Sequence, residues 1–427
     1  MIAALARRLP FFYGWVVVAI AFMTMAIGVN ARTAFSLLFP PILAEFGWDR
    51  AATAGAFSFG FLISAILGPT MGRLIDRQGP VWMLEGGVIA VAAGLWLATF
   101  ATAPWHLYAT LGALVGGGTV AIGYTGQALY VPNWFLRRRA LAMSLAYSGA
   151  GAGSILLLPY AQVVIDAAGW RTACTTMAVL IVVVLVPLNL LVCRRPQDIG
   201  LTPDGDSAAV ALERRSVTIV NPDWAAIDWT LARAIRTAPF WWITIGNFSA
   251  LFAWYAVQVH QTKYLVDIGF APTTAAWALG AVSLAGIPGQ IVMGLVSDRV
   301  GREPVWIAGC CGFVLTYGIL IAMAAAPSTA MLWLMVFVQG MLGYGLTSVL
   351  GPIVAEIYEG RNFGTIYGTV TVGAIMGGGA GPWVVGLLHD LTGAYFSGFL
   401  LSGGFSVVSA IAIWMAAPRK IRRVGRA

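Results

Sequence analysis

The chain has 427 residues, of which 59% are hydrophobic and only 10% are charged, whereas a typical soluble domain has about 25% charged residues. So few polar residues could not cover a soluble core of this size, which excludes a soluble protein. The hydrophobic residues form continuous runs near the roughly 20 residues that a helix needs to cross a bilayer. These runs lack the polar–apolar alternation of barrel strands. The sequence therefore predicts an all-α membrane protein.

Twelve such runs follow one another, and we expect each to form one transmembrane helix. Their centres lie near Ile20, Phe61, Ala90, Ala121, Gly151, Val183, Leu251, Ala285, Phe313, Gly343, Ile375 and Val407. A charged stretch separates the sixth run from the seventh. We therefore expect an N-terminal six-helix bundle over 1–193, a cytoplasmic linker over 194–237, and a C-terminal six-helix bundle with a basic cytoplasmic tail over 238–427.

The linker is expected to contain a short amphipathic helix over 228–237, with Asp228 as its N-cap. Leu231, Ala234 and Ile235 would then face lipid, and the helix would couple the two bundles only loosely.

The placement of basic residues predicts the orientation of the chain. All but four of the 25 Lys and Arg residues fall on one side of the predicted helices, the exceptions being Arg32, Arg50, Arg171 and Lys263. Because cytoplasmic loops carry the excess of basic residues, we expect both termini in the cytoplasm and the chain in the plasma (inner) membrane. The net charge of +8 is then an orientation signal facing anionic lipid, and we expect no nucleic-acid partner.

The sequence contains an internal repeat. "MGRLIDRQGP" begins at Met71 and "MGLVSDRVGR" begins at Met293, 222 positions later. The glycine-rich runs after Ser148 and after Gly373 recur at nearly the same offset. A repeat of half the chain predicts two pseudo-symmetric bundles that share one cavity near the middle of the bilayer.

The two loops share the pattern G-x-L/V-x-D-R-x-G, which resembles the signature loop of the major facilitator superfamily. The stretches "FYGWVVVAIAF", "FPPILAEFGWDRAAT", "NWFLRRRALAMSLAYSGAGAG", "RRPQDIGLTPDGD" and "AEIYEGRNFGTIYG" resemble its bacterial monocarboxylate-transporter-like and oxalate/formate-antiporter-like branch. The resemblance implies a secondary active transporter that works by alternating access, with helices 1, 4, 7 and 10 lining the cavity.

The charged loops are candidates for gating. An aspartate beside a helix N-terminus is stabilised by the partial positive charge there. The resemblance implies that two cytoplasmic latches close one side of the transporter, made by Asp76, Arg77, Asp298, Arg299 and Glu356. Glu356 is the expected partner of Arg299. The alternative is that these residues only fix loop geometry and topology.

Polar residues within the predicted spans are candidates for substrate binding. They are Arg32, Tyr124, Gln127, Asn247, Trp254, Gln258, Gln290, Tyr344 and Ser348. Arg32 could grip a carboxylate with two hydrogen bonds, or it could extend to the outer surface and bind nothing. His260 and Arg32 are candidates for proton coupling, since histidine changes charge near neutral pH. The alternative for His260 is an interfacial hydrogen bond.

Carriers of this branch commonly have an arginine on helix 8, where this chain has Gln290, and the lysine of oxalate carriers on helix 11 has no counterpart. The expected substrate is therefore a small organic anion, in particular a monocarboxylate, moved with a proton. Export of neutral or amphipathic compounds is the alternative, and a membrane-embedded sensor or enzyme is a remote one. No metal spacing or nucleotide motif occurs, so we expect no metal or cofactor and a protein that is not an enzyme. We also expect a monomer.

The glycines at four-residue spacing on helices 5 and 11 are interpreted as packing positions. They are Gly149, Gly153, Gly373, Gly377 and Gly381. Bare backbone on one helix face permits close contact with a neighbouring helix.

Overall fold

The computed structural model describes residues 6, 8–48, 50–206 and 219–422. Within these residues the secondary structure is helical, without a strand. The longer helices are α2 (Gly14–Thr33), α3 (Phe35–Phe46), α4 (Arg50–Gln78), α5 (Pro80–Ala98), α9 (Arg139–Asn189), α13 (Ala238–Asp267), α14 (Pro272–Val300), α15 (Arg302–Ala325), α16 (Thr329–Val338), α17 (Gly345–Ile357), α18 (Phe363–Thr392) and α19 (Phe396–Ala416). Shorter elements are α6 (Pro104–Leu107), α7 (Gly117–Ile122), α8 (Tyr124–Ala128), α11 (Pro222–Ala225) and α12 (Leu231–Ala234).

The helices confirm the all-α membrane architecture. Ten helical stretches of the described chain are long and apolar enough to cross a membrane. One of them, α9, contains two helices, since Gly169 interrupts it with φ +81°. The 30-residue helix α13, which carries several polar residues, is not among the ten. Counting α9 twice and adding α13 gives the twelve spans that the sequence predicts for the described residues.

Each of the repeated loops ends in a glycine whose backbone has a positive φ, a conformation that other residues rarely adopt. Gly79 has φ +83° and Gly301 has φ +104°, a region that costs other L-residues roughly 1–2 kcal/mol. Each glycine separates two long helices, α4 from α5 and α14 from α15. The last glycine of the G-x-L/V-x-D-R-x-G pattern is therefore required by the tight turn between two spans.

Two spans contain π-helical segments. η1 (Tyr108–Gly116) lies between α6 and α7, and η5 (Gln339–Gly343) lies between α16 and α17. Neighbouring helices approach both segments closely. A Cβ atom on Gly116 would lie 2.5 Å from Cα of Gly60, and one on Gly340 would lie 2.6 Å from Cβ of Ala285. Glycine at these positions lets the wider π turns fit beside the next helix.

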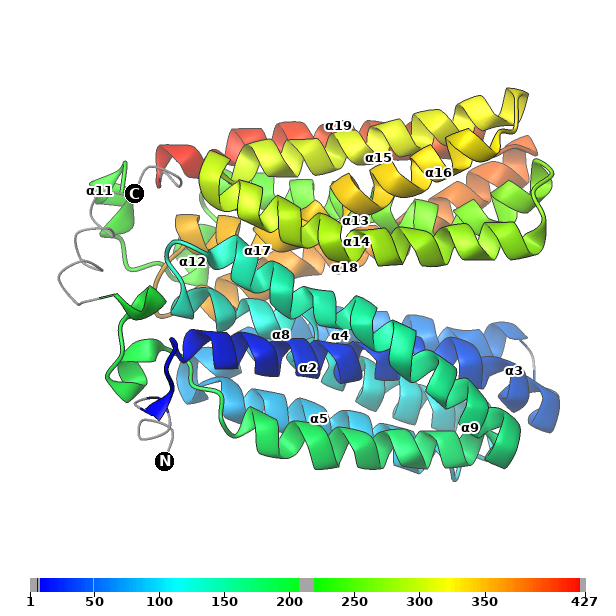
Figure 1. Cartoon of the computed structure of the whole chain (residues 1–427), viewed down its shortest axis with the longest axis horizontal. Coiled ribbons are helices and arrows are strands. Elements are labelled where there is room, and N and C mark those ends of the chain that lie inside the picture. Colours follow the sequence, from blue (N-terminus) through cyan, green and yellow to red (C-terminus); the bar gives the residue numbers. More distant parts are fainter. Residues whose placement is uncertain (1–5, 7, 49, 207–218, 423–427) are drawn as a thin grey trace. The chain divides into compact units, whose positions relative to one another are not determined.

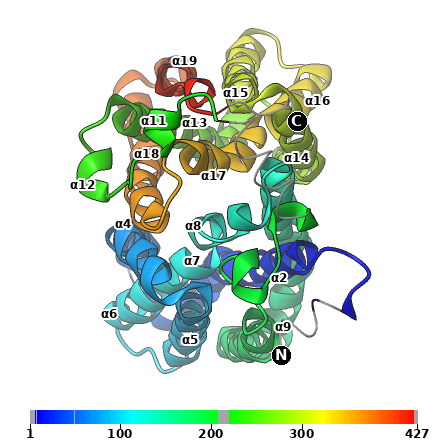
Figure 2. The same cartoon turned by 90° about the vertical axis from the view of Figure 1, so that its left-hand side faces the viewer.

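Contacts divide the chain into two compact units. Unit 1 comprises Met1–Leu136, Leu145–Leu212 and Asn362–Gly368, and unit 2 comprises Arg137–Ser144, Glu213–Arg361 and Thr369–Ala427. The helix α9 thus begins in unit 2 and continues in unit 1, whereas α18 begins in unit 1 and continues in unit 2. In unit 2, α13 and α15 both run along α19 (Figure 1). In unit 1, α7 lies among α2, α4 and α5 (Figure 2).

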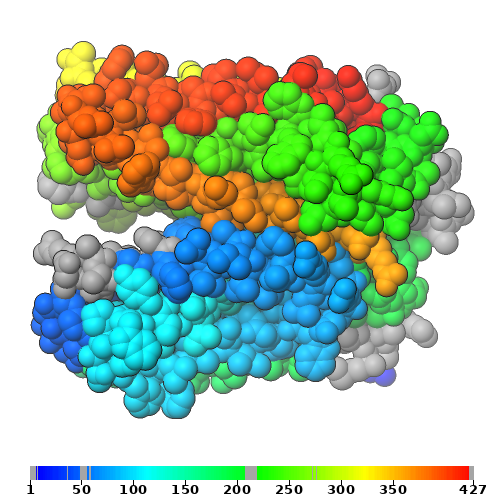
Figure 3. Space-filling model, turned by 180° about the vertical axis from the view of Figure 1, so that it is seen from behind, coloured from blue at the N-terminus to red at the C-terminus, as the bar shows by residue number. Residues whose placement is uncertain are grey.

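Glycines allow the close packing within each unit, as expected. In unit 1, a Cβ atom on Gly153 would lie 2.0 Å from the carbonyl oxygen of Ala26 on α2. In unit 2, a Cβ atom on Gly377 would lie 2.0 Å from the carbonyl oxygen of Phe248 on α13. In the space-filling view, the start of α13 and the chain before it (green) lie between α19 (red) and α18 (orange) (Figure 3).

The expected helix over 228–237 is wrong in its start and length. Helix α12 covers only Leu231–Ala234, and its N-cap is Thr230, whose side-chain oxygen accepts from the backbone N–H of Arg233. The carbonyl oxygen of Asp228 accepts from the Arg233 guanidinium at 2.9 Å. Ala234, which was expected to face lipid, is fully buried in protein. A threonine nearer the helix therefore caps it in place of the aspartate.

Candidate functional site

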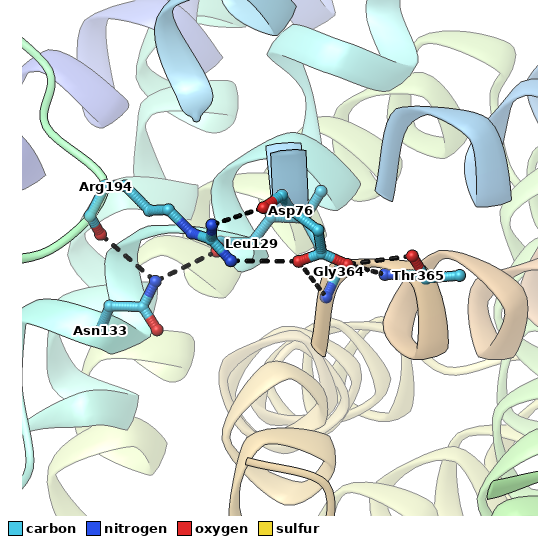
Figure 4. Close-up of polar contacts among 6 residues, drawn as sticks. All are labelled: Asp76, Leu129, Asn133, Arg194, Gly364 and Thr365. Atoms are coloured by element: carbon cyan, nitrogen blue, oxygen red, sulfur yellow. Dashed lines mark hydrogen bonds and ion pairs between the residues drawn. The ribbon is translucent and has the colours of Figure 1, made fainter. Parts of the chain in front are cut away.

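The carboxylate of Asp76 lies at the N-terminus of α18 (Figure 4). The sequence predicts a helix N-terminus beside this aspartate. Its Oδ1 accepts from the backbone N–H of Gly364 at 3.1 Å, and its Oδ2 accepts from the N–H and the hydroxyl of Thr365 at 2.8 and 2.9 Å. The Arg194 guanidinium lies 3.2 Å from Oδ1 and also donates to the Asp76 carbonyl at 2.7 Å. We call Asp76, Arg194, Gly364 and Thr365 the first latch.

The backbones of α4 and α18 touch beside this carboxylate. A Cβ atom on Gly72 would lie 2.0 Å from the carbonyl oxygen of Gly364, and one on Gly368 would lie 2.4 Å from that of Gly68. Any side chain at these glycines would force the helices apart and withdraw the N–H groups from Asp76. The first glycine of the loop pattern is therefore needed for the first latch.

Asp298 makes the corresponding arrangement in unit 2. Its two oxygens accept from the backbone N–H groups of Ala140 and Leu141, at 3.1 and 3.0 Å, in the first turn of α9. Arg302 donates to the same carboxylate at 2.6 Å. We call Asp298, Arg302, Ala140 and Leu141 the second latch. The expected position of both aspartates beside helix N-termini is confirmed, and their gating role stays a prediction.

Glu356 pairs with Arg302, so the expected pairing with Arg299 is wrong. The Nε of Arg302 donates to Glu356 at 2.8 Å, and its guanidinium also donates to the Ser297 hydroxyl at 3.1 Å. The side chain of Arg302 is 1% exposed and that of Glu356 is 4% exposed, whereas Arg299 and Arg77 are exposed. A buried charge requires a partner, and Arg302 at the start of α15 is the cation that reaches Glu356.

Sequence reasoning missed Arg194 and Arg302, the two cations that contact the latch carboxylates. Arg302 directly follows the second loop pattern, in "DRVGR", and this position is the one local signal for it. Arg194 lies 118 residues from Asp76, so no spacing rule connects the two.

Four candidate binding residues come together in unit 2. The rings of Trp254 and Tyr344 lie 4.5 Å apart. On the next turn, the Ser348 hydroxyl donates to the carbonyl oxygen of Gln290 at 2.9 Å, and Thr347 donates to the Gln290 side chain at 3.3 Å. The cluster joins α13, α14 and α17 and contains an indole, a phenol and a buried amide. Such groups can hold a polar solute that has an apolar body.

Two further candidates lie on α13. Asn247 is fully buried, and neither atom of its amide has a hydrogen-bond partner among the described residues. Gln258 is half-buried, one helical turn after Trp254. A buried amide without a partner is costly, so Asn247 is suited to bind a water molecule or a polar solute.

The candidates of unit 1 do not form one cluster. Gln127 is fully buried, donates to the Ile122 carbonyl at 3.1 Å and accepts from the Tyr130 hydroxyl, so its amide is engaged within its own span. Tyr124 is 42% exposed and packs edge-on against Tyr147.

Arg32 lies in the last turn of α2, where the helix dipole favours a cation. It is half-buried, and its guanidinium carbon lies 3.8 Å from the centre of the Phe61 ring. This cation–π contact holds the guanidinium beside α4.

His260 connects α13 to α18 within unit 2. Its Nε2 lies 2.8 Å from the carbonyl oxygen of Pro382, and because a carbonyl only accepts, Nε2 carries the hydrogen. The Nδ1 atom is then the one that can take up a proton. The imidazole also faces the Tyr395 ring, with centroids 5.4 Å apart. His260 thus makes a hydrogen bond between helices, and its coupling role stays a prediction.

The sequence matches a family model described as the Major Facilitator Superfamily, over residues 15–271 and 243–426. It is similar to monocarboxylate transporter 13 of Rattus norvegicus, with 28% identity over 92% of this chain and 86% of the relative. It is also similar to monocarboxylate transporter 11 of Homo sapiens, with 27% identity over 97% of this chain and 84% of the relative.

Two solved structures have the same fold at low sequence identity. The proton:xylose symporter XylE has a TM-score of 0.73 and 12% identity, with 97% of each chain covered. The transporter FucP in its outward conformation has a TM-score of 0.67 and 15% identity, with 94% of this chain and 97% of that chain covered.

Proposed function

Because the chain belongs to the Major Facilitator Superfamily and is a secondary transporter, we propose that it carries a small organic anion, in particular a monocarboxylate, together with a proton. The observation that carries this proposal is the similarity to monocarboxylate transporters over more than nine-tenths of the chain. The substrate class is thereby taken from relatives at 27–28% identity, and the residues of this chain give it chemical support.

The proposed anchor for the carboxylate is Arg32. A planar guanidinium can donate two parallel hydrogen bonds to a carboxylate, which a neutral solute would not use. The candidate groups of the unit 2 cluster are neutral: Gln290, Ser348, Trp254 and Tyr344. A set of candidates that contains one cation suits a substrate with one carboxylate and an apolar body, and suits a dicarboxylate less well.

The proposed proton carrier is His260. Its Nε2–H is used by the Pro382 carbonyl at 2.8 Å, which leaves Nδ1 for protonation. Protonation at Nδ1 would keep the bond to Pro382 intact and add a positive charge at this end of α13. We propose that this charge couples proton movement to substrate movement, with Arg32 as the counterpart on α2.

The proposed cycle is alternating access, gated by the two latches. Each latch holds the first turn of a long helix through a carboxylate, and opening requires those N–H groups to leave Asp76 or Asp298. Together with the placement of basic residues, this supports cytoplasmic termini and latches on the cytoplasmic side of the plasma (inner) membrane. We propose that the monomer is the transporting unit.

Uptake into proteoliposomes tests the substrate. Labelled lactate-like and aromatic carboxylates should enter faster under an inward proton gradient, and neutral analogues should not compete. Arg32→Gln should reduce uptake by about thirtyfold or more, from the loss of a charged hydrogen-bond pair, whereas Arg32→Lys should retain part of it. The control is Arg73→Gln, which removes an exposed charge.

Two results would contradict the carboxylate proposal. Uptake that is unchanged in Arg32→Gln would exclude Arg32 as the group that binds the carboxylate. Competition by neutral compounds alone would favour the alternative function, transport of neutral or amphipathic solutes.

A further inference from the structure

The linker is docked at both of its described ends, each within its own unit. Its first segment, residues 194–206, and Cys193 just before it lie against the loop that precedes α9. The Trp134 indole donates to the Cys193 carbonyl at 3.1 Å, and the Asn133 amide donates to the Arg194 carbonyl at 3.3 Å. The backbone N–H of Leu136 donates to the Asp204 carboxylate at 2.8 Å. Trp134 is fully buried, so this contact belongs to the core of unit 1.

The second segment, residues 219–237, docks on the loop that precedes α18. The Trp224 indole donates to the Ile357 carbonyl at 2.8 Å, and the Thr237 hydroxyl lies 2.5 Å from the Tyr358 hydroxyl. The Trp229 ring packs edge-on against Tyr358, with centroids 5.1 Å apart. Tyr358 is fully buried, and burial raises the pKa of its hydroxyl to about 12.

The C-terminal tail completes the second docking site. The backbone N–H of Val220 donates to the Ile421 carbonyl at 2.9 Å, and Arg422 pairs with Glu359 next to Tyr358. The loop between α17 and α18 is therefore held by the linker on one side and by the tail on another, all within unit 2.

The two docked loops have the same place in the repeat. The loop before α9 leads to Ala140 and Leu141, which Asp298 holds, and the loop before α18 leads to Gly364 and Thr365, which Asp76 holds. The first linker segment also supplies Arg194, which contacts the Asp76 carboxylate directly (Figure 4). The linker thus contacts the first latch directly through Arg194, and it contacts the chain just before the second latch at Leu136.

We propose that Arg194 and Trp224 are positioning residues of the transport cycle: the docked linker holds the helix starts where the latch carboxylates can bind them. The inference rests on the proposed gating role of the latches. Releasing Trp224 lets the loop at Ile357 and Tyr358 move, and the N–H groups of α18 then leave Asp76 more readily. Releasing Arg194 removes the cation from the same carboxylate. Both changes favour the open form of the first latch.

The test measures access to a reporter cysteine from each side of the membrane. Tyr124→Cys is placed in a chain whose four native cysteines are replaced, and a membrane-impermeant maleimide is added on either side. Trp224→Phe keeps the ring and removes the indole donor, so labelling from the cytoplasmic side should rise by about fivefold and labelling from the outer side should fall. Arg194→Gln should act in the same direction by about tenfold or more.

Two matched variants serve as controls. Trp241→Phe removes another indole bond of 2.8 Å, to the Ile235 carbonyl at an exposed site, and should leave labelling unchanged. Arg195→Gln removes the neighbouring charge, which makes no side-chain contact with Asp76. Should Trp224→Phe fold poorly, Thr237→Val removes the hydroxyl bond to Tyr358 and addresses the same loop.

The outcomes separate this inference from the gating proposal. Opposite changes on the two sides support positioning, whereas a merely loosened structure would raise labelling on both sides. If Trp224→Phe and Arg194→Gln match the parent while Asp298→Asn changes the labelling, the positioning role is wrong and the latches remain. If Asp298→Asn also has no effect, the gating proposal itself is wrong.

Discussion

Replacing Asp298 by Asn should shift the access equilibrium, because the second latch depends on charge. Asn keeps the shape of the side chain and can still accept one of the two N–H groups of Ala140 and Leu141. It loses the other acceptor and the charged contact with Arg302 at 2.6 Å. Arg302 retains Glu356 at 2.8 Å, so the change does not leave a buried guanidinium without any counter-charge.

The magnitude follows from these contacts. A hydrogen bond to a charged group contributes about 1.5–3 kcal/mol, and the carboxylate at the helix N-terminus adds about 0.3–1 kcal/mol. Part of the first contribution survives in the asparagine, so the latch should weaken by about 2–3 kcal/mol. A difference of about 1.4 kcal/mol is tenfold, and the population should therefore shift by about 30-fold to about 140-fold.

Labelling of a reporter cysteine from the two sides of the membrane measures this shift. Cytoplasmic labelling should increase and outer labelling should decrease. The control is Asp390→Asn, because the side chain of Asp390 is 82% exposed and its one described pairing, with His389, is at the surface. Labelling that is unchanged from both sides in Asp298→Asn would show that this carboxylate only shapes the loop.

Two further changes test the helix contact and the proton. Gly72→Ala should open the first latch, since its Cβ would lie 2.0 Å from the Gly364 carbonyl oxygen. The control Gly86→Ala, whose Cβ would meet no atom within 4 Å, should transport normally. Equal uptake by both variants would refute the contact argument. His260→Gln can still donate to Pro382, so the variant should keep its thermal stability in detergent. Because glutamine cannot take up a proton, the variant should lose the stimulation of uptake by a proton gradient. Stimulation that persists would exclude His260 as the proton carrier.

Much of the fold could be predicted from the sequence because its signals are local. The bilayer sets the length of each apolar run, and the twelve runs appear as helices in the described chain. The repeated loop was informative because each of its residues has a separate structural role. Gly72 allows α4 to contact α18, Asp76 accepts from backbone N–H groups, and Gly79 turns the chain with a positive φ. Each role constrains one position, so the pattern is visible without any structure.

The partners of buried charges could not be predicted in the same way. Glu356 was assigned to Arg299, but Arg302, which lies beyond the turn at Gly301, reaches it from the start of α15. Arg194 comes to Asp76 from a linker that sequence reasoning treated as loose. Hydropathy places a residue along the membrane normal and leaves its neighbours around the helix axis undetermined, so contacts between distant segments require the packed structure.

The π-helical segment η5 has a consequence for how the cluster in unit 2 could change. A π turn holds one more residue than an α turn, so converting η5 to α-helix would turn α17 by about 100° and advance it by about 1.5 Å. Tyr344 and Ser348 would then face another direction while the span stays continuous. Deleting one residue of η5 would leave an α-helical turn with α17 in its present direction, so the span could no longer rotate in this way. A deletion mutant whose Tyr344→Cys reporter still alternates between labelling from the two sides would disprove this role for η5. A single surplus residue would thus store the rotation that exchanges one set of solute contacts for another.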